Sequence, residues 1–122
     1  MNAGRAAYIR GLRNLADMLE QNDDLLLPYD GTGSRITIHY LHAPDPIAGL
    51  IAAMQAIPCG FTSSISVYAD GDRDAYLDLD GELHGVKIRL TAYRKGTCDR
   101  VGGEWRIPDA ITSRAPEAEA TA

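Results

Sequence analysis

The chain contains little cysteine, which limits the metal and disulfide chemistry open to it. Cys59 and Cys98 are its two cysteines, and neither belongs to a CxxC pair. A structural zinc site needs a spaced set of cysteine and histidine ligands, whereas His39, His42 and His84 are scattered along the chain. We therefore expect no structural zinc, and two unpatterned thiols fit the reducing conditions of the cytoplasm.

Long apolar runs are also missing. No stretch approaches the roughly 18 consecutive apolar residues of a membrane-spanning helix. The first residues carry Arg5, Arg10 and Arg13 but no apolar core of the length found in signal peptides. We expect a soluble, cytoplasmic protein that has no membrane partner.

Two common enzyme signatures are absent as well. The glycines at residues 30–33 precede a predicted strand, whereas phosphate-binding glycines follow a strand and precede a helix. Ser63, Ser64 and Ser66 lack the GxSxG surroundings of a hydrolase nucleophile. We predict that the protein is not an enzyme and uses no cofactor, and we keep a small metal-binding protein or enzyme as an alternative.

Length and composition fit one globular domain. The 122 residues are 45% hydrophobic and 24% charged, and the net charge of −5 disfavours a broad nucleic-acid-binding surface. After Pro108 the chain turns to alanine, glutamate, serine and threonine. We predict a single domain over residues 1–108 and a disordered tail over residues 109–122.

Two helices are predicted from the spacing of apolar residues. Residues 3–22 and residues 46–57 each place apolar side chains on one stripe of a helix. Asp45 is a suitable cap for the second helix, Pro46 suits its first turn, and Pro58 ends it. The stripes consist of Ile9, Leu12, Leu15, Ala16 and Leu19, and of Ile47, Leu50, Ile51, Met54 and Ile57.

Strands are predicted where apolar and polar residues alternate. These segments are residues 35–41, 61–69, 75–80 and 86–93, and a short hairpin around Gly102 and Gly103 follows them. The predicted fold class is α+β, with two helices packed on one face of a mainly antiparallel sheet. The order of elements is α-β-α-β-β-β plus the short C-terminal hairpin.

Matching the apolar sets of neighbouring strands predicts the register of the sheet. The register leaves residues 70–74 and 81–84 as loops. The expected pairs are Leu79 with Val86, Leu77 with Ile88, Asp78 with Lys87, Tyr76 with Arg89, and Val67 with Leu77.

An acidic stretch runs through these strands and loops. Its first three aspartates have the alternate spacing of a calcium loop, but Ala75 and Gly81 occupy the positions of the required glycine and the final glutamate. We interpret the stretch as acidic turns and a strand, without a metal. Its members are Asp70, Asp72, Asp74, Asp78, Asp80 and Glu82.

One histidine and two cysteines are candidates for reactive side chains, and each also has a structural interpretation. For His39, a solvent-facing or hydrogen-bonded strand histidine is favoured over a catalytic one. Cys59 follows a helix end, where the dipole disfavours a thiolate. Cys98 has basic neighbours and is the better candidate for a reactive thiol, although a small apolar role on an edge strand is favoured.

The exposed face of the sheet is the predicted binding site. Mixed charge and exposed tyrosines suit a protein interface better than a uniformly charged surface does. The residues concerned are Tyr68, Tyr76, Lys87, Arg89, Tyr93 and Trp105. Trp105 is also a candidate anchor for a second copy of the chain, so a homo-oligomer is possible.

A nucleic-acid-binding module is the alternative interpretation of the same region. The basic strand over residues 87–100 has a tyrosine interleaved with its cations, as on some sheets that bind single strands. Its cations are Lys87, Arg89, Arg94, Lys95 and Arg100. A protein partner is favoured because the acidic side chains of the neighbouring strand neutralise much of this charge.

Several short segments resemble a group of small uncharacterised proteins encoded by actinobacteria, their phages and integrated mobile elements. The segments are residues 8–20, 27–29, 36–39 and 98–103, and the last matches a C-x-R-V-x-G ending. The likeness spans most of residues 8–103, but residues 102–105 replace a threonine-rich or valine-rich strand. The resemblance brings no known activity. It implies an accessory protein of phage or mobile-element origin. With the predicted binding face of the sheet, we expect a non-enzymatic protein that binds a host or phage protein.

Overall fold

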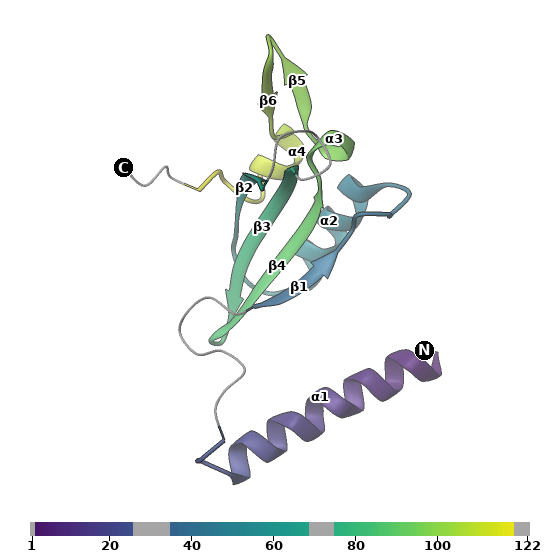
Figure 1. Ribbon diagram of the computed structural model, residues 1–122, viewed down its shortest axis with the longest axis vertical. Coiled ribbons are helices and arrows are strands. Elements are labelled where there is room, and N and C mark those ends of the chain that lie inside the picture. The colour runs from purple at the N-terminus through teal and green to yellow at the C-terminus, as the bar shows by residue number, and fades with distance from the viewer. Residues whose placement is uncertain (1, 26–34, 69–74, 119–122) are drawn as a thin grey trace. The chain divides into compact units, whose positions relative to one another are not determined.

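The computed structural model describes residues 2–25, 35–68 and 75–118 of the chain (Figure 1). The chain divides into two compact units, Met1–Ser34 and Arg35–Ala122, and each unit is described by itself. Within the described residues, no helix is long and apolar enough to cross a membrane.

The first unit contains helix α1 (Ala3–Gln21), which confirms the helix predicted over residues 3–22. The helix begins after Asn2, whose side-chain oxygen accepts a hydrogen bond of 2.7 Å from the Arg5 amide. At the other end, the Asn22 side chain donates to the Met18 carbonyl at 2.9 Å. Packing of this helix on the sheet stays a prediction.

The second unit contains a four-stranded sheet in the order β1-β4-β3-β2 (Figure 1). Its strands are β1 (Ile36–His39), β2 (Phe61–Val67), β3 (Ala75–Leu83) and β4 (Val86–Tyr93). β3 pairs antiparallel with β2 and β4, whereas β1 pairs with β4 in parallel. The predicted α+β class with a mainly antiparallel sheet is confirmed.

Helix α2 (Pro46–Ala56) connects β1 to β2 and confirms the second predicted helix. Asp45 caps it, because its carboxylate accepts a hydrogen bond of 3.1 Å from the Ala48 amide. Pro46 occupies the first turn, where the missing N–H costs nothing.

The hydrophobic core lies between α2 and one face of the sheet. Alternate side chains of β3 and β4 point into it, and Leu77, Leu79 and Leu90 are fully buried together with Leu50 of α2. Burying one leucine side chain is worth about 1.5–3 kcal/mol. The cost of exposing these leucines therefore fixes which face of each strand points inward.

The predicted register is wrong along the sheet, although the predicted inward faces are correct. Leu79 pairs with Leu90 and Leu77 with Ala92, so β4 is displaced by four residues from its predicted position. The other predicted pairs are replaced by Asp78 with Thr91, Tyr76 with Tyr93, and Val67 with Ala75. The predicted loop at residues 70–74 lies outside the described residues.

The reason for the displacement is the turn between β3 and β4. Residues 81–83 continue β3, and His84 and Gly85 alone make the turn, with φ values of +49° and +87°. Two consecutive residues with positive φ form a turn that matches the twist of a tight hairpin. The predicted loop over residues 81–84 is therefore wrong: β3 extends three residues beyond its predicted end, whereas β4 has its predicted bounds.

The predicted C-terminal hairpin is confirmed as β5 (Asp99–Val101) and β6 (Glu104–Arg106). Gly102 and Gly103 form its turn, again with positive φ values of +60° and +85°. A single helical turn, α3 (Arg94–Thr97), connects β4 to this hairpin.

The disordered tail predicted from residue 109 is wrong for residues 109–118. These residues form helix α4 (Asp109–Thr112) and a segment that runs beside β2, with Ile111 and Ala115 fully buried. The Ser63 hydroxyl donates to the Ala115 carbonyl at 2.7 Å. The Ser63 backbone also donates to Pro116 at 2.9 Å and accepts from Ala118 at 2.8 Å. The segment thus closes part of the β2 edge.

Ile111→Ala is expected to lower the free energy of unfolding by about 2–4 kcal/mol, because it empties a fully buried position. Urea denaturation of the full chain measures the change. The neighbouring exposed substitution Ala110→Ser serves as the control and should shift stability by less than about 0.5 kcal/mol. Equal midpoints for the two variants would contradict a structural role for this segment.

Candidate functional site

The candidate site is the face of the sheet opposite the core, which we call the outer face. The pairing of the strands brings to it the side chains that alternate with the buried ones. From β3 and β4 these are Tyr76, Asp78, Asp80 and Glu82, and Lys87, Arg89, Thr91 and Tyr93. Thr37 and His39 of β1 and Thr62, Ser64 and Ser66 of β2 complete the face.

Four rings form a row across the outer face, which we call the aromatic row. Tyr93 and Tyr76 lie directly opposite each other, with ring centroids 5.6 Å apart and planes inclined by only 23°. Tyr68 lies 5.7 Å beyond Tyr76, and His42 contacts Tyr93 edge-on at 6.2 Å. Each such pair is worth about 0.5–1.5 kcal/mol beyond the area it buries. The row is therefore ordered before any partner binds.

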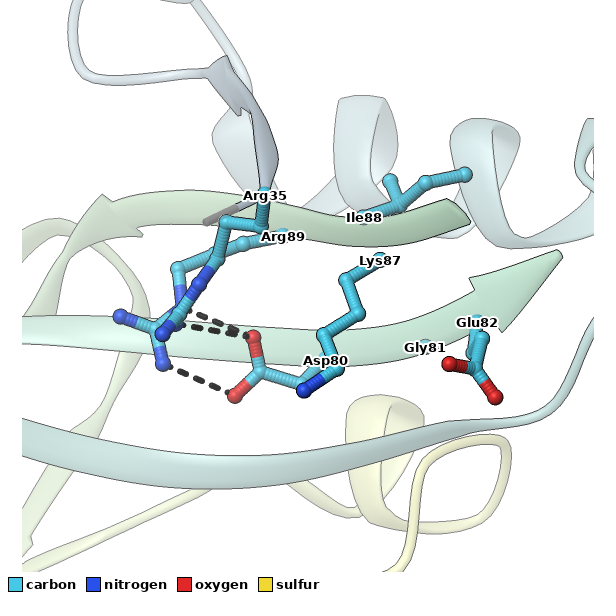
Figure 2. A pocket seen from close by; sticks show the side chains of 7 residues that line it. All are labelled: Arg35, Asp80, Gly81, Glu82, Lys87, Ile88 and Arg89. Carbon is cyan, nitrogen blue, oxygen red and sulfur yellow. Dashed lines mark hydrogen bonds and ion pairs between the residues drawn. The ribbon is translucent and has the colours of Figure 1, made fainter. Parts of the chain in front are cut away.

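A charged cluster adjoins the aromatic row, since Arg89 lines the same hollow as Tyr68 and Tyr76. Figure 2 shows the cluster. Arg89 donates two hydrogen bonds to Asp80, from Nε at 2.7 Å and from Nη2 at 2.9 Å. The Arg35 guanidinium lies 3.8 Å from the same carboxylate, and the two guanidinium groups lie close together in Figure 2. The hydrogen bond to Asp80, with the nearby carboxylates, raises the pKa of Arg89, so its positive charge is permanent.

The carboxylate of Asp78 lies beneath this cluster and is only 2% exposed. The Thr91 hydroxyl donates to Oδ1 at 2.7 Å, and the Ser66 hydroxyl donates to Oδ2. Arg89 Nη1 approaches Oδ2 at 3.4 Å. A buried carboxylate requires such compensation, because removing a charge from water is costly. Both oxygens of Asp78 are thus engaged in structural contacts.

The structure brings most of the predicted site residues together. Tyr68, Tyr76, Arg89 and Tyr93 lie on or beside the aromatic row, and Lys87 lies opposite Glu82 near the turn. Trp105 does not join them. It lies on β6 and packs against the core, and the guanidinium groups of Arg94 and Arg100 lie 4.4 Å and 5.4 Å from its ring centre.

Histidines contribute to the outer face in two ways. His39 helps line a hollow of about 440 Å³ together with Leu41, Tyr68 and Tyr76. His42 belongs to the aromatic row, although it lies outside the predicted strands and is not among the predicted binding residues. No periodic signal could have identified it, because it follows a strand in an irregular connection.

The two cysteines differ in environment. Cys98 is buried in the core, and this burial raises the pKa of its thiol, outweighing the opposing effect of the Thr97 hydroxyl. Cys59 is half-buried at the end of α2. The structure therefore favours the small apolar role of Cys98 over that of a reactive thiol.

Part of the acidic stretch has a structural role, and part lies outside the residues that the structure describes. Asp70, Asp72 and Asp74 belong to the part of the chain that the structure leaves undescribed, whereas Asp78 and Asp80 hold Ser66, Thr91 and Arg89. Among the residues described, no group of three histidine, cysteine or acidic side chains is placed to hold a metal ion.

Asp78→Asn is expected to lower the free energy of unfolding by about 1–3 kcal/mol. The amide nitrogen replaces an acceptor with a donor, so either Ser66 or Thr91 loses its acceptor, and Arg89 loses a buried countercharge. Asp80→Asn is the matched control, because Asp80 is 38% exposed, and it should cost less than about 1 kcal/mol. Urea denaturation at one salt concentration compares them, and the reverse order would count against the structural role of Asp78.

Cys98 is expected to react with a thiol reagent only slowly in the folded protein. Because the folded state holds the thiol proton more tightly than the unfolded state, stability should fall as the pH rises through the ordinary thiol range. The Cys59→Ser and Cys98→Ser variants isolate each thiol, and labelling at pH 8 with and without urea measures the rates. Equal native rates for the two thiols would contradict the burial argument.

Comparison of the chain with protein-family models, with curated proteins and with solved structures finds no match.

Proposed function

We propose that the protein is a non-enzymatic accessory protein of phage or mobile-element origin that binds a host or phage protein through the aromatic row. The observation that carries the proposal is the continuous contact of His42, Tyr93, Tyr76 and Tyr68 across the sheet. The resemblance of short segments to proteins of actinobacteria and their phages supports the origin and the kind of partner.

The aromatic row has the properties of a protein-binding surface. Tyrosine is enriched at interfaces because its ring supplies contact area and its hydroxyl supplies a hydrogen bond. The contacts among Tyr68, Tyr76 and Tyr93 restrict their rotamers, so a partner loses less conformational entropy in ordering them. Tyr68, which is 68% exposed at the end of the row, is the natural anchor.

The same geometry disfavours a nucleic-acid partner. A base stacks on the open face of an aromatic ring, and the packing of Tyr76 against Tyr93 leaves less open ring surface on the sheet for this purpose. Part of the positive charge of the basic strand is also neutralised, since Arg89 pairs with Asp80. Neutralised cations contribute little to the counterion release that drives such binding.

Site-specific photo-crosslinking tests the proposal. A photo-reactive phenylalanine analogue at position 68 should yield a discrete protein adduct in an actinobacterial lysate. The matched control is position 67, because Val67 is also exposed but lies on the opposite face of the sheet. Once the adduct protein is purified, Tyr68→Ser should weaken its binding by at least about 2 kcal/mol, roughly 30-fold.

The outcomes separate the alternatives. An adduct at position 68 that nuclease leaves intact, and whose digest contains peptides of a second protein, supports a protein partner. A nuclease-sensitive adduct would replace the proposal with the nucleic-acid alternative. The same adduct at positions 67 and 68, or no adduct at either, would reject the aromatic row as the binding surface.

A further inference from the structure

A groove at one end of the sheet lies apart from Tyr68 and has a different chemistry. Its volume is about 630 Å³, within the range of pockets that hold small molecules. It is lined by Tyr40, Leu41, Ala43, Pro44, Pro46, Tyr93, Lys95 and Gly96. We call it the β1–β4 groove.

The position of the groove follows from the parallel pairing of β1 with β4. Because the two neighbouring strands run in the same direction, their carboxyl ends lie at one end of the sheet. The chain leaves β1 through residues 40–45 and leaves β4 through α3, and the groove lies between these two connections. Crevices outside the carboxyl ends of parallel strands are the usual ligand sites of open sheets.

Both aromatic walls of the groove are held in place by the fold. The Tyr40 ring lies directly on the backbone of α2, since a Cβ at Gly49 would be only 2.8 Å from it. The Tyr93 ring is fixed between Tyr76 and His42. Walls that do not have to be ordered on binding favour a ligand of matching shape.

The shape and polarity of the lining favour a ligand with a flat apolar group. Two tyrosines and two prolines supply flat, weakly polar surfaces, and Leu41 and Ala43 add aliphatic ones. An aromatic ring is the ligand group that best fills such a site, because it can stack on or meet the tyrosine edges and bury area against the prolines.

The positive charge of Lys95 in the lining favours an anionic ligand. Lys95 is the one charged side chain among the eight lining residues, and it is exposed on the α3 side. Asp45, which lies between the two prolines in sequence but not in the lining, accepts a hydrogen bond from the Ala48 amide at the start of α2. A carboxylate on the ligand can therefore meet the Lys95 ammonium group.

We propose that the β1–β4 groove binds a small aromatic carboxylate, with the ring between Tyr40, Tyr93 and the prolines and the carboxylate at Lys95. The groove shares Tyr93 with the aromatic row but does not include Tyr68, the proposed anchor for the protein partner. The two can fail separately, because the crosslinking experiment does not involve Lys95 or Gly96.

Benzoate, benzamidine and benzyl alcohol are suitable probes, because they share a ring and differ in charge. Titration of the isotope-labelled full chain in a buffer free of carboxylates, followed by amide NMR, locates each probe. Benzoate should bind saturably with a dissociation constant of about millimolar order, as expected for so few atoms. The largest shifts are expected at Leu41, Ala43, Lys95 and Gly96.

Two variants test the assignment without touching the core. Lys95→Gln should weaken benzoate binding by up to about fivefold, because it removes an exposed countercharge. Gly96→Leu should abolish binding by filling the groove, and it should fold because a Cβ there meets no atom within 4 Å. Gly60→Leu is the matched control, because its Cβ position is equally open but lies outside the lining.

Each outcome decides for or against the site. Preferential shifts by benzoate in the groove, lost in Gly96→Leu and kept in Gly60→Leu, support it. Equal binding of benzyl alcohol would overturn the role of Lys95 and thus the carboxylate class. Shifts scattered outside the groove, or unchanged benzoate binding by folded Gly96→Leu protein, would overturn the site itself.

Discussion

The turn at His84 and Gly85 is the constraint from which the outer face follows. Positive φ at both residues closes β3 onto β4 without any further loop. That closure sets each cross-strand pair in turn, so that Arg89 meets Asp80 and Tyr93 meets Tyr76. A longer loop would leave the same residues on the same face but would place different neighbours beside them. Both the charged cluster and the aromatic row are thus consequences of a two-residue connection.

The difference between predicted and observed register has a physical cause. Alternation reveals which side chains are buried, because burial favours one face of each strand, and this part of the prediction is confirmed. It does not reveal which residue lies opposite which, since a displacement by four residues keeps every apolar side chain inward. Only the turn decides between such registers, and a His-Gly pair is a weaker signal than Asn-Gly. The composition of the C-terminal segment likewise suggested disorder, because most of its residues are polar or small. Its contribution to the core comes from only two side chains, Ile111 and Ala115.

Most residues of the candidate site could be predicted from the sequence, but the contacts between them could not. The outward tyrosines of β3 and β4 follow from alternation, whereas their mutual stacking required the true register. His42 joins the site from an irregular connection, whereas Trp105 is absent from it because its side chain packs against the core. The β1–β4 groove depends on a parallel pairing between segments separated by about 50 residues. Nothing in the local sequence of either strand specifies that pairing, because the same alternation suits either direction.

The contact between Ser63 and the C-terminal segment bears on how the protein avoids self-association. An edge strand offers unpaired amide and carbonyl groups to any extended chain, and a long exposed edge is a template for aggregation. Ser63 uses both of its outward backbone groups and its hydroxyl on residues of the same chain. At the opposite edge, β1 is only four residues long, which gives a foreign strand little to pair with. A substitution that breaks the pairing of residues 115–118 with β2 would therefore destabilise the fold. It would also expose the β2 edge to pairing with other chains, which promotes aggregation.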